Sequence, residues 1–374
     1  MHDRKSATGI QPRPELEHVP SVPHGGFHCR SAMMPEPADL LDFSANVNPF
    51  GPSPRIWDAM RTVPIEQHPD PRATPLRLFL AEHLGVEPRQ LLVGNGSVDL
   101  IYHLAVAYLR TGDRVLVVEP TFGEYATAAA MMGAEVVRYR TDPATHFALD
   151  IEAFLALARK TQPRLLFLCN PNNPTGTYLN QEAIVQILTH CPDTLCVLDE
   201  AFVRFVPTAW SLLDVLASAS NLLILRSLTK DYALTGLRVG YALSHPPIIA
   251  ALEKVQPPWS VNTLAQAAAI AALQDEEYLQ TTLTTLARAS HALAQDLVRI
   301  RLWPLPSRTH FCLLPVPSAD VWTRELYARQ ILVRDCSSFG LPTYIRLAAR
   351  GMHDNARLVA ALAEIGGRRC PAGC

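Results

Sequence analysis

Short apolar runs alternate with segments of helix length through the middle of this 374-residue chain. A strand bounded by helices indicates βαβ units, so the alternation predicts an α/β fold with a mainly parallel sheet. The expected strands are Leu91–Val93, Val115–Glu119, Glu135–Tyr139, Leu165–Cys169, Cys196–Leu198, Leu222–Leu225 and Arg238–Leu243. The expected helices between them are Val98–Leu109, Tyr125–Met132, Ile151–Arg159 and Glu182–His190.

The pattern changes at about residue 260. Long Ala- and Leu-rich helices are followed by short strands and a last helix, which predicts a small α+β domain. These elements are Asn262–Leu273, Tyr278–Arg301, His310–Leu314, Ile331–Asp335, Tyr344–Leu347 and Asp354–Ile365. We therefore expect a Pro-rich arm over residues 1–50 that contributes to the small domain and the active site, a large domain over 51–259 and a small domain over 260–374.

Composition excludes several classes of protein. The chain is 48% hydrophobic and 18% charged, which is enough apolar material for a large core. A net charge of −2 gives no basic field for nucleic acid. No apolar run is long enough to cross a membrane and no secretory signal opens the chain, so we expect a cytoplasmic protein. The eight cysteines form no CxxC pair, so neither a metal site nor a disulfide framework is expected.

Two loops at expected strand ends have unusual compositions. In open parallel sheets, ligands bind beyond the carboxyl ends of the strands. Gly94-Asn95-Gly96-Ser97 precedes a helix and could cradle a phosphate, although the same residues also suit a plain turn and helix cap. The segment Asn170–Gly176 contains two Asn-Pro steps, which fix an irregular loop.

Two further strand ends carry charged side chains. Asp199 ends a buried strand, where a carboxylate needs a partner unless it caps a helix. Lys230 follows another strand, beside hydroxyl groups and close to Arg238. A single lysine is usually exposed at a surface, but a desolvated lysine near a second cation becomes an amine nucleophile.

Taken together, these loops resemble those of the fold-type I pyridoxal-phosphate (PLP) enzymes, in the aminotransferase branch. The similarity runs from about Leu41 to Leu362 and rests on the motifs NPNNPTG, DEAF and SLTK…GLRVGY in this order. It implies a large domain with a mainly parallel seven-stranded sheet, a small α+β domain and PLP as cofactor. It also implies a homodimer with shared active sites.

The resemblance implies a role for each matching residue around the cofactor. Lys230 would form an imine with the PLP aldehyde, and Asp199 would pair with the ring nitrogen so that the ring accepts electrons. Asn173 would donate to the ring 3-oxygen, and Phe122 would stack on the ring. The phosphate would be held by Gly96, Ser97, Val98, Ser227 and Arg238, with His68 of the neighbouring subunit in the place of the usual Tyr. A solvent-facing His68 is the alternative.

The resemblance also places substrate-binding residues. Arg346 is similar to the family's carboxylate clamp and Arg334 to its phosphate partner, with His24, Asn46 and Asn173 nearby. Each arginine lies in an apolar run, where a buried charge needs an anion; a protein carboxylate is the alternative to a substrate. His24 lies in a His-Gly-Gly segment that also suits a flexible turn.

Two branches of the family compete for the reaction. The stretches 41–49, 226–232 and 258–262 are similar to those of the L-threonine-O-3-phosphate decarboxylases, and Phe202 stands where aminotransferases usually have Tyr. We therefore expect decarboxylation of L-threonine O-3-phosphate to (R)-1-aminopropan-2-yl phosphate for cobalamin assembly. Trp259 and Phe202 are expected to leave little space for an imidazole ring. Histidinol-phosphate aminotransferase, or a related aminotransferase, is the alternative.

Overall fold

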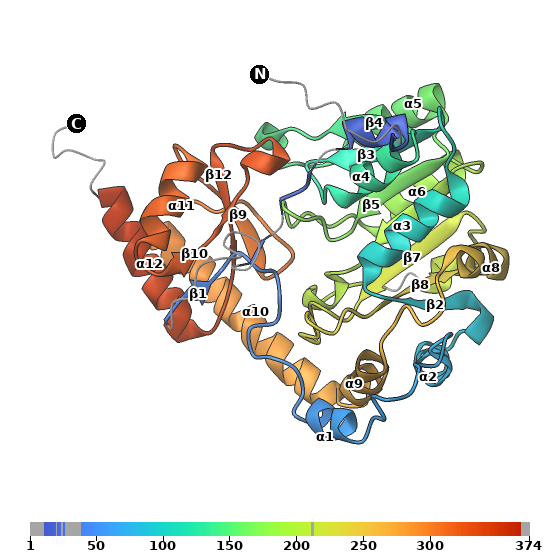
Figure 1. The fold of residues 1–374 in the computed structure, drawn as a ribbon. Coiled ribbons are helices and arrows are strands. Elements are labelled where there is room, and N and C mark those ends of the chain that lie inside the picture. The colour runs from blue at the N-terminus through green and yellow to red at the C-terminus, as the bar shows by residue number, and fades with distance from the viewer. Residues whose placement is uncertain (1–10, 20, 24, 27–38, 211–212, 368–374) are drawn as a thin grey trace.

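A seven-stranded sheet forms the centre of the larger part of the molecule (Figure 1). The computed structural model describes residues 11–19, 21–23, 25–26, 39–210 and 213–367. The strands lie in the order β2-β8-β7-β6-β5-β3-β4, with β8 antiparallel to both of its neighbours and the others parallel. The strands are β2 (Leu91–Gly94), β3 (Arg114–Glu119), β4 (Glu135–Arg140), β5 (Leu165–Cys169), β6 (Leu195–Asp199), β7 (Leu222–Ser227) and β8 (Gly240–Ser244). The predicted α/β class is confirmed.

Both faces of this sheet are buried under helices. Leu166 and Leu168 of β5 belong to one core cluster, whereas Leu165 and Phe167 belong to another. Successive side chains of a strand point to opposite faces, so the continuous apolar runs are explained by two covered faces. The first cluster includes α2 (Thr74–Leu84), α5 (Ile151–Thr161), α6 (Gln181–His190) and α9 (Thr263–Leu273), and the second α3 (Ser97–Tyr108), α4 (Glu124–Met131) and α8 (Pro246–Val255).

A smaller part follows the long helix α10 (Glu276–Arg299). Its sheet contains β9 (Phe311–Pro315), β12 (Tyr344–Ala348) and β11 (Arg334–Asp335), all antiparallel. The helices α11 (Ala319–Tyr327) and α12 (Met352–Gly367) pack with these strands in a core of their own. The arm joins this part, because β1 (Leu41–Asp42) pairs in parallel with β10 (Ile331–Leu332).

Three predicted elements differ from the structure. The strand expected over Ile331–Asp335 is divided between β10 and β11, which pair in different sheets. The strand expected from Arg238 begins at Gly240, because Arg238 has a left-handed backbone with φ of 60°. The helix α9 lies in the core cluster of the large sheet, although the boundary expected at residue 260 placed it with the small domain.

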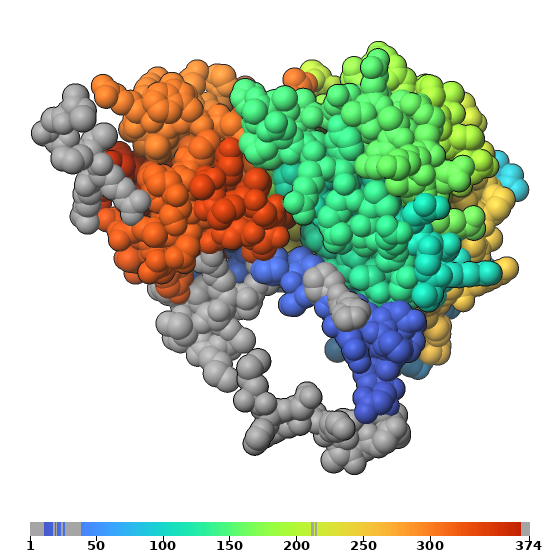
Figure 2. All heavy atoms as spheres, turned by 90° about the horizontal axis from the view of Figure 1, so that it is seen from above, coloured from blue at the N-terminus to red at the C-terminus, as the bar shows by residue number. Residues whose placement is uncertain are grey.

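The two parts touch along a seam that includes the loop after β5. Figure 2 shows the residues of the large sheet and the C-terminal residues as two adjoining lobes. The backbone N–H of Arg308 donates to the carbonyl of Gly176 at 2.9 Å across this seam.

The remaining α-helices are α1 (Arg55–Arg61), which packs on α9, and α7 (Leu213–Leu216). Within the described residues, no helix has the length and hydropathy needed to cross a membrane.

Candidate active site

Most of the predicted cofactor residues lie at one edge of the large sheet. The carboxyl ends of β5 and β6 lie side by side there, with Cys169 in register with Asp199. β2 and β7 are both antiparallel to β8, so they run in the same direction and also end at this edge. Their register places Gly94 and Ser227 on either side of Gly240.

Backbone amides and a guanidinium gather at the start of α3. Gly96 has φ of +85°, and a Cβ built on it would lie 2.5 Å from Arg238 Nη2. A Cβ on Gly240 would lie 2.8 Å from the amide nitrogen of Ser97. Because α3 has no side-chain cap and begins at Ser97, its first N–H groups remain available to an anion. Glycine at these two positions therefore lets the Arg238 guanidinium and the first amide groups of α3 come close together, which is the arrangement of an anion cradle.

Asp199 is buried at the end of β6, with 3% of its surface exposed. Its Oδ2 accepts from the Tyr125 hydroxyl at 2.7 Å, and its Oδ1 from the Ala201 amide at 3.0 Å. Burial raises the pKa of Asp199, whereas these two hydrogen bonds and the charge of Lys230 lower it. The carboxylate therefore has two donors that favour its ionised form.

Lys230 lies in the loop after β7, close to these groups. Burial lowers the pKa of Lys230 to about 8, with further lowering by Arg346 and Arg238 and an opposing effect of Asp199. At pH 7 about a tenth of a lysine with this pKa is neutral, far more than at the ordinary pKa of about 10.4, and the neutral amine is the nucleophile. The carbonyl of Lys230 accepts a hydrogen bond from the backbone N–H of Asn48 at 2.8 Å, and this bond holds the arm against the loop.

Arg346 lies on β12 and crosses the seam to the large part. Its Nη1 donates to Asn173 Oδ1, and its Nη2 donates to the carbonyl of Ser44 at 2.6 Å. Among the described residues no carboxylate forms an ion pair with it, and its buried Nε has no hydrogen-bond partner. Burial lowers the pKa of Arg346 to about 10. A buried cation with an unused donor fits an anionic ligand.

Arg334 of β11 lies directly beside Arg346, because the two residues are in register across the sheet. Its Nη2 donates to the carbonyl of Pro23 at 2.7 Å and to Ser338 Oγ at 2.8 Å. Asn46, 4% exposed, has no partner for either amide atom among the described residues. His24 lies outside the described residues.

Three residues singled out in the sequence lie elsewhere. His68 is exposed and stacks on Trp259, with ring centroids 4.7 Å apart. Trp259 is 48% exposed. Phe202 is buried in the core of the small part, edge to face with Phe311 at 5.0 Å. The expectation that Trp259 and Phe202 leave little space for an imidazole ring stays a prediction, since the ring centroid of Phe311, which Phe202 contacts, lies 5.6 Å from the Arg346 guanidinium carbon. The contact of His68 with a neighbouring subunit stays a prediction.

The sequence analysis missed two side chains near the site. Tyr125 belongs to the same segment as Phe122, and its place at the start of an expected helix after a strand could have drawn attention to it. His310 is 4% exposed, and neither ring nitrogen has a partner among the described residues. Burial, Arg346 and Lys230 lower the pKa of His310 to about 3. The sequence predicts only a strand over His310–Leu314, which gives His310 no role in the site.

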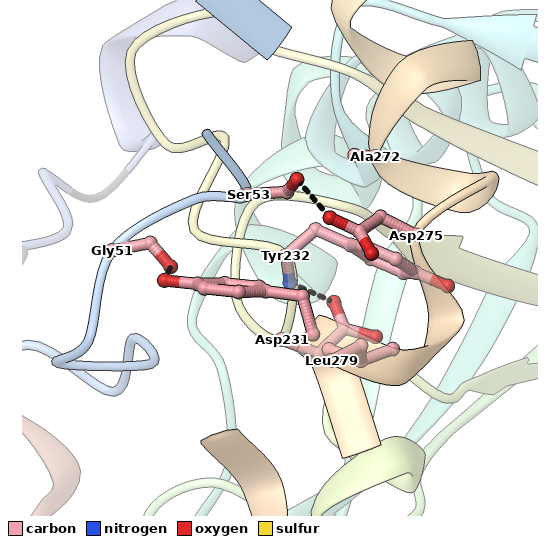
Figure 3. Close-up of a pocket in the computed structure, with 8 residues that line it drawn as sticks. Gly51, Ser53, Asp231, Tyr232, Ala272, Asp275 and Leu279 are labelled. Carbon is pink, nitrogen blue, oxygen red and sulfur yellow. Dashed lines mark hydrogen bonds between the residues drawn. The ribbon is translucent and has the colours of Figure 1, made fainter. Parts of the chain in front are cut away.

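A small cavity lies where the lysine loop meets the arm and the α9–α10 junction (Figure 3). Ser53 Oγ donates to Asp275 Oδ2 at 2.5 Å beside it, and Tyr232 N–H donates to Asp231 Oδ1 at 3.0 Å. Its volume of ≈ 10 Å³ has room for about one water molecule. The cavity is therefore too small for a substrate, although Asp231, the residue after Lys230, lines it.

Comparison with known proteins identifies the family. The model of the family described as aminotransferase class I and II matches residues 38–365. The chain belongs to this family. A histidinol-phosphate aminotransferase of Moorella thermoacetica is 36% identical, over 87% of this chain and 86% of that protein. The histidinol-phosphate aminotransferase of Sinorhizobium meliloti, solved with pyridoxal 5'-phosphate, has a TM-score of 0.87, 26% identity, and coverage of 98% of this chain and 100% of that one.

These relatives correct the expected reaction. The L-threonine-O-3-phosphate decarboxylase of Porphyromonas gingivalis has a lower TM-score of 0.78, with 28% identity and coverage of 88% of this chain and 100% of that one. Relatives at 33–38% identity are histidinol-phosphate aminotransferases, so the prediction of a decarboxylase was wrong. The stretches that favoured it surround the cofactor and the arm, whose requirements the two branches share.

The residues at the sheet edge fit the predicted cofactor. PLP needs a nucleophilic amine, a carboxylate for its ring nitrogen and a cradle for its phosphate. Lys230, Asp199 and the Gly96–Arg238 cradle supply these groups on adjoining loops. The cofactor of this family member is pyridoxal 5'-phosphate.

Proposed function

We propose that this chain is a PLP-dependent aminotransferase that moves the amino group of histidinol phosphate to 2-oxoglutarate. The observation that carries the proposal is the set of histidinol-phosphate aminotransferases at 33–38% identity that align with 87–88% of the chain. The reaction is balanced: histidinol phosphate becomes the corresponding ketone, and 2-oxoglutarate becomes glutamate.

The cofactor side of the proposal rests on the strand-end loops. When bound, PLP supplies an aldehyde that forms an imine with an amine and a ring that withdraws electrons from it. We propose that Asp199 holds a proton on the ring nitrogen, that Asn173 donates to the ring 3-oxygen and that Phe122 covers one ring face. The phosphate lies in the cradle of Gly96, Ser97, Val98, Ser227 and Arg238.

Lys230 has two tasks in this proposal. Its neutral amine would hold the cofactor through the aldehyde and, once displaced by substrate, would accept the proton that leaves the substrate's α-carbon. Burial, together with the positive charges of Arg346 and Arg238, lowers the pKa of Lys230 to about 8, so part of the amine is neutral near neutral pH and able to accept a proton.

The substrate side rests on the two arginines. Histidinol phosphate carries a phosphate and no carboxylate, whereas 2-oxoglutarate carries two carboxylates. We propose that Arg346 binds the carboxylate beside the keto group, through the donors that now contact Asn173 and Ser44. Arg334, His24 and Asn46 bind the substrate phosphate, and Asn173 positions the substrate through Arg346. A bidentate anion suits the planar guanidinium.

We also propose a homodimer with shared sites. The support is the family resemblance together with the exposed position of His68, which does not reach the Lys230 site of its own chain. In the dimer, His68 donates to the partner subunit's cofactor phosphate.

Product analysis with matched reactions tests the proposed function. Holoenzyme is incubated with histidinol phosphate and 2-oxoglutarate, and separately with L-threonine O-3-phosphate alone. Glutamate and the ketone should form in equal amounts in the first reaction, and the Lys230→Ala variant should form neither. Carbon dioxide release in the second reaction, without glutamate in the first, would contradict the proposal.

A further inference from the structure

Tyr125 connects two side chains that the proposed function places against the cofactor ring. Its hydroxyl donates to Asp199 Oδ2 at 2.7 Å. Its ring lies edge to face with Phe122, with centroids 5.7 Å apart. No role was assigned to Tyr125 by the motifs, because the contact depends on how α4 packs over the ends of β5 and β6.

The position of Tyr125 is fixed from several sides. It is fully buried and stacks on Phe167 of β5, with ring centroids 4.9 Å apart and an interplanar angle of 9°. Because Phe167 lies two residues before the end of β5, the stacked phenol reaches the sheet edge where Asp199 ends β6. A packed ring of this kind has few rotamers, so its hydroxyl presents one direction to the carboxylate.

We propose that Tyr125 is a positioning residue that keeps Asp199 ionised and oriented toward the pyridine nitrogen of the cofactor. This inference rests on the PLP site of the proposed function. Tyr125 itself acts through Asp199 and does not touch the reacting atoms. The hydroxyl holds Oδ2, the Ala201 amide holds Oδ1, and the remaining lone pairs of the carboxylate can face the ring nitrogen.

The electrostatics show why a second donor is needed. Asp199 is buried, and burial opposes its ionisation and raises its pKa above the usual value. The hydroxyl of Tyr125 lowers the pKa of Asp199, whereas burial and Asp199 raise the pKa of Tyr125 well above its usual value. Of the two groups, the phenol therefore holds its proton more tightly than the carboxyl, so the Tyr125 hydroxyl is the donor. Without the hydroxyl, a protonated Asp199 could no longer stabilise a pyridinium.

Tyr125→Phe removes this hydroxyl and keeps the stacked ring. Tyr102→Phe is the matched control, because the Tyr102 hydroxyl also donates to a carboxylate, Glu124 Oε2, at 2.5 Å. The readout is the ring-nitrogen chemical shift of bound 15N-labelled PLP in substrate-free holoenzyme, followed across pH. The dissociation constant of PLP is measured in parallel.

The wild type and Tyr102→Phe should both show a protonated ring nitrogen. Tyr125→Phe should shift the resonance toward the unprotonated position and raise the dissociation constant about tenfold, as for a lost hydrogen bond to a charged group. If folded Tyr125→Phe kept the wild-type ring-nitrogen shift and titration, the proposal would be overturned. A loss of thermal stability alone would show only that Tyr125 packs in the core.

A second variant covers the case in which Tyr125→Phe does not fold. Replacement of Tyr125 by 3-fluorotyrosine adds one small atom and makes the hydroxyl a stronger donor. The ring nitrogen of bound PLP should then stay protonated to a higher pH than in the wild type. An unchanged titration of the ring nitrogen would contradict the proposal. This test uses no substrate, so its result does not depend on the proposed reaction. If the holoenzyme formed no glutamate, the proposed reaction would be wrong, but the test of Tyr125 could still be carried out.

Discussion

The cofactor side and the substrate side of the site differ in how far their polar groups are satisfied. At the edge of the large sheet, Asp199 has a donor for each oxygen. On the small-domain side, several buried polar atoms have no partner among the described residues. They are both amide atoms of Asn46, both ring nitrogens of His310, and Arg346 Nε. Leaving such a group unpaired costs about 1–3 kcal/mol, so these atoms are expected to gain partners when ligands bind.

The part of the site around Asp199 is therefore arranged before any ligand binds. Fixed donors around Asp199 suit a cofactor that remains in place through each cycle. Unused donors and acceptors on the other side suit two substrates that alternate in one space, one with a phosphate and one with carboxylates. Variants on the cofactor side should therefore change the attachment, affinity or protonation of the cofactor. Variants on the substrate side should change KM or kcat/KM for the substrates.

The largest effect is expected for Lys230→Ala. Loss of the amine removes both the bond to the cofactor and the base, so turnover should fall by at least about 10³-fold. Absorbance of the borohydride-reduced protein and glutamate formation measure the two losses. Lys254→Ala, at an exposed position of α8, is the control and should keep wild-type activity. Cofactor that remains covalently attached in Lys230→Ala would refute the assignment.

Arg346→Gln should have the next largest effect. The unpaired guanidinium is expected to bind the keto-acid carboxylate, so kcat/KM for 2-oxoglutarate should fall about 10²-fold or more. PLP affinity should change little. Arg350→Gln is the matched control, because Arg350 already pairs with Asp354 at 2.8 Å. Equal losses in the two variants would show that Arg346 only supports the fold.

Two asparagines of the arm allow a direct test of the comparison. Asn48 donates to the Asp231 carbonyl at 3.0 Å and to Thr282 at 2.9 Å, whereas Asn46 has no partner among the described residues. Asn48→Leu should lower the free energy of unfolding by about 2 kcal/mol or more. Asn46→Leu should leave the free energy of unfolding unchanged or raise it, because no hydrogen bond of the Asn46 side chain is lost, and it should raise the KM for histidinol phosphate about tenfold. Chemical denaturation and steady-state kinetics measure both; the reverse pattern would contradict the account.

The rate of cofactor uptake should depend on pH. The pKa of Lys230 is lowered to about 8, and only the neutral amine attacks the aldehyde. Reconstitution of apoenzyme with PLP should therefore speed up as pH rises and level off above about 8. Because Arg346 contributes to this lowered pKa, Arg346→Gln should move the curve to higher pH. A pH-independent rate, or a shift to lower pH, would be inconsistent with this electrostatic role.

His310 should make a smaller contribution to stability that depends on pH. The pKa of His310 in the folded protein is lowered to about 3, below the ordinary value of about 6.5 in the unfolded chain. Its neutral form is therefore favoured by folding, and stability should fall as pH drops below about 6.5, by at most about 1.4 kcal/mol per pH unit. Unfolding curves of wild type and His310→Asn between pH 7 and pH 5 should diverge; parallel pH dependence would exclude this effect.

Much of the cofactor side could be predicted from the sequence. Parallel strands end at one edge, so the loops with Asp199, Lys230 and Gly96 had to meet once the strands were recognised. The hydrogen bond of Tyr125 could not be predicted, because it depends on the packing of a helix across two strands. The neighbouring positions of Arg334 and Arg346 depend on strand register, which the two isolated apolar runs do not determine.

The choice of reaction could not be predicted in the same way. The motifs around Lys230 serve any PLP enzyme of this fold, so small likenesses there misled the choice between amino transfer and decarboxylation. Phe202 and Trp259 also gave only weak support for decarboxylation. Phe202 lies in a hydrophobic core, and Trp259 is about half exposed beside His68. Substrate choice depends on atoms that still lack partners, and a sequence does not show which atoms those are.

The most direct test of the central claim is a single half-reaction. Holoenzyme is mixed with histidinol phosphate in the absence of any keto acid, and the ketone formed per active site is measured. The account predicts one equivalent of ketone, with the amino group retained on the enzyme until added 2-oxoglutarate releases it as glutamate. No ketone from histidinol phosphate, with Lys230 fully loaded with cofactor, would contradict the account.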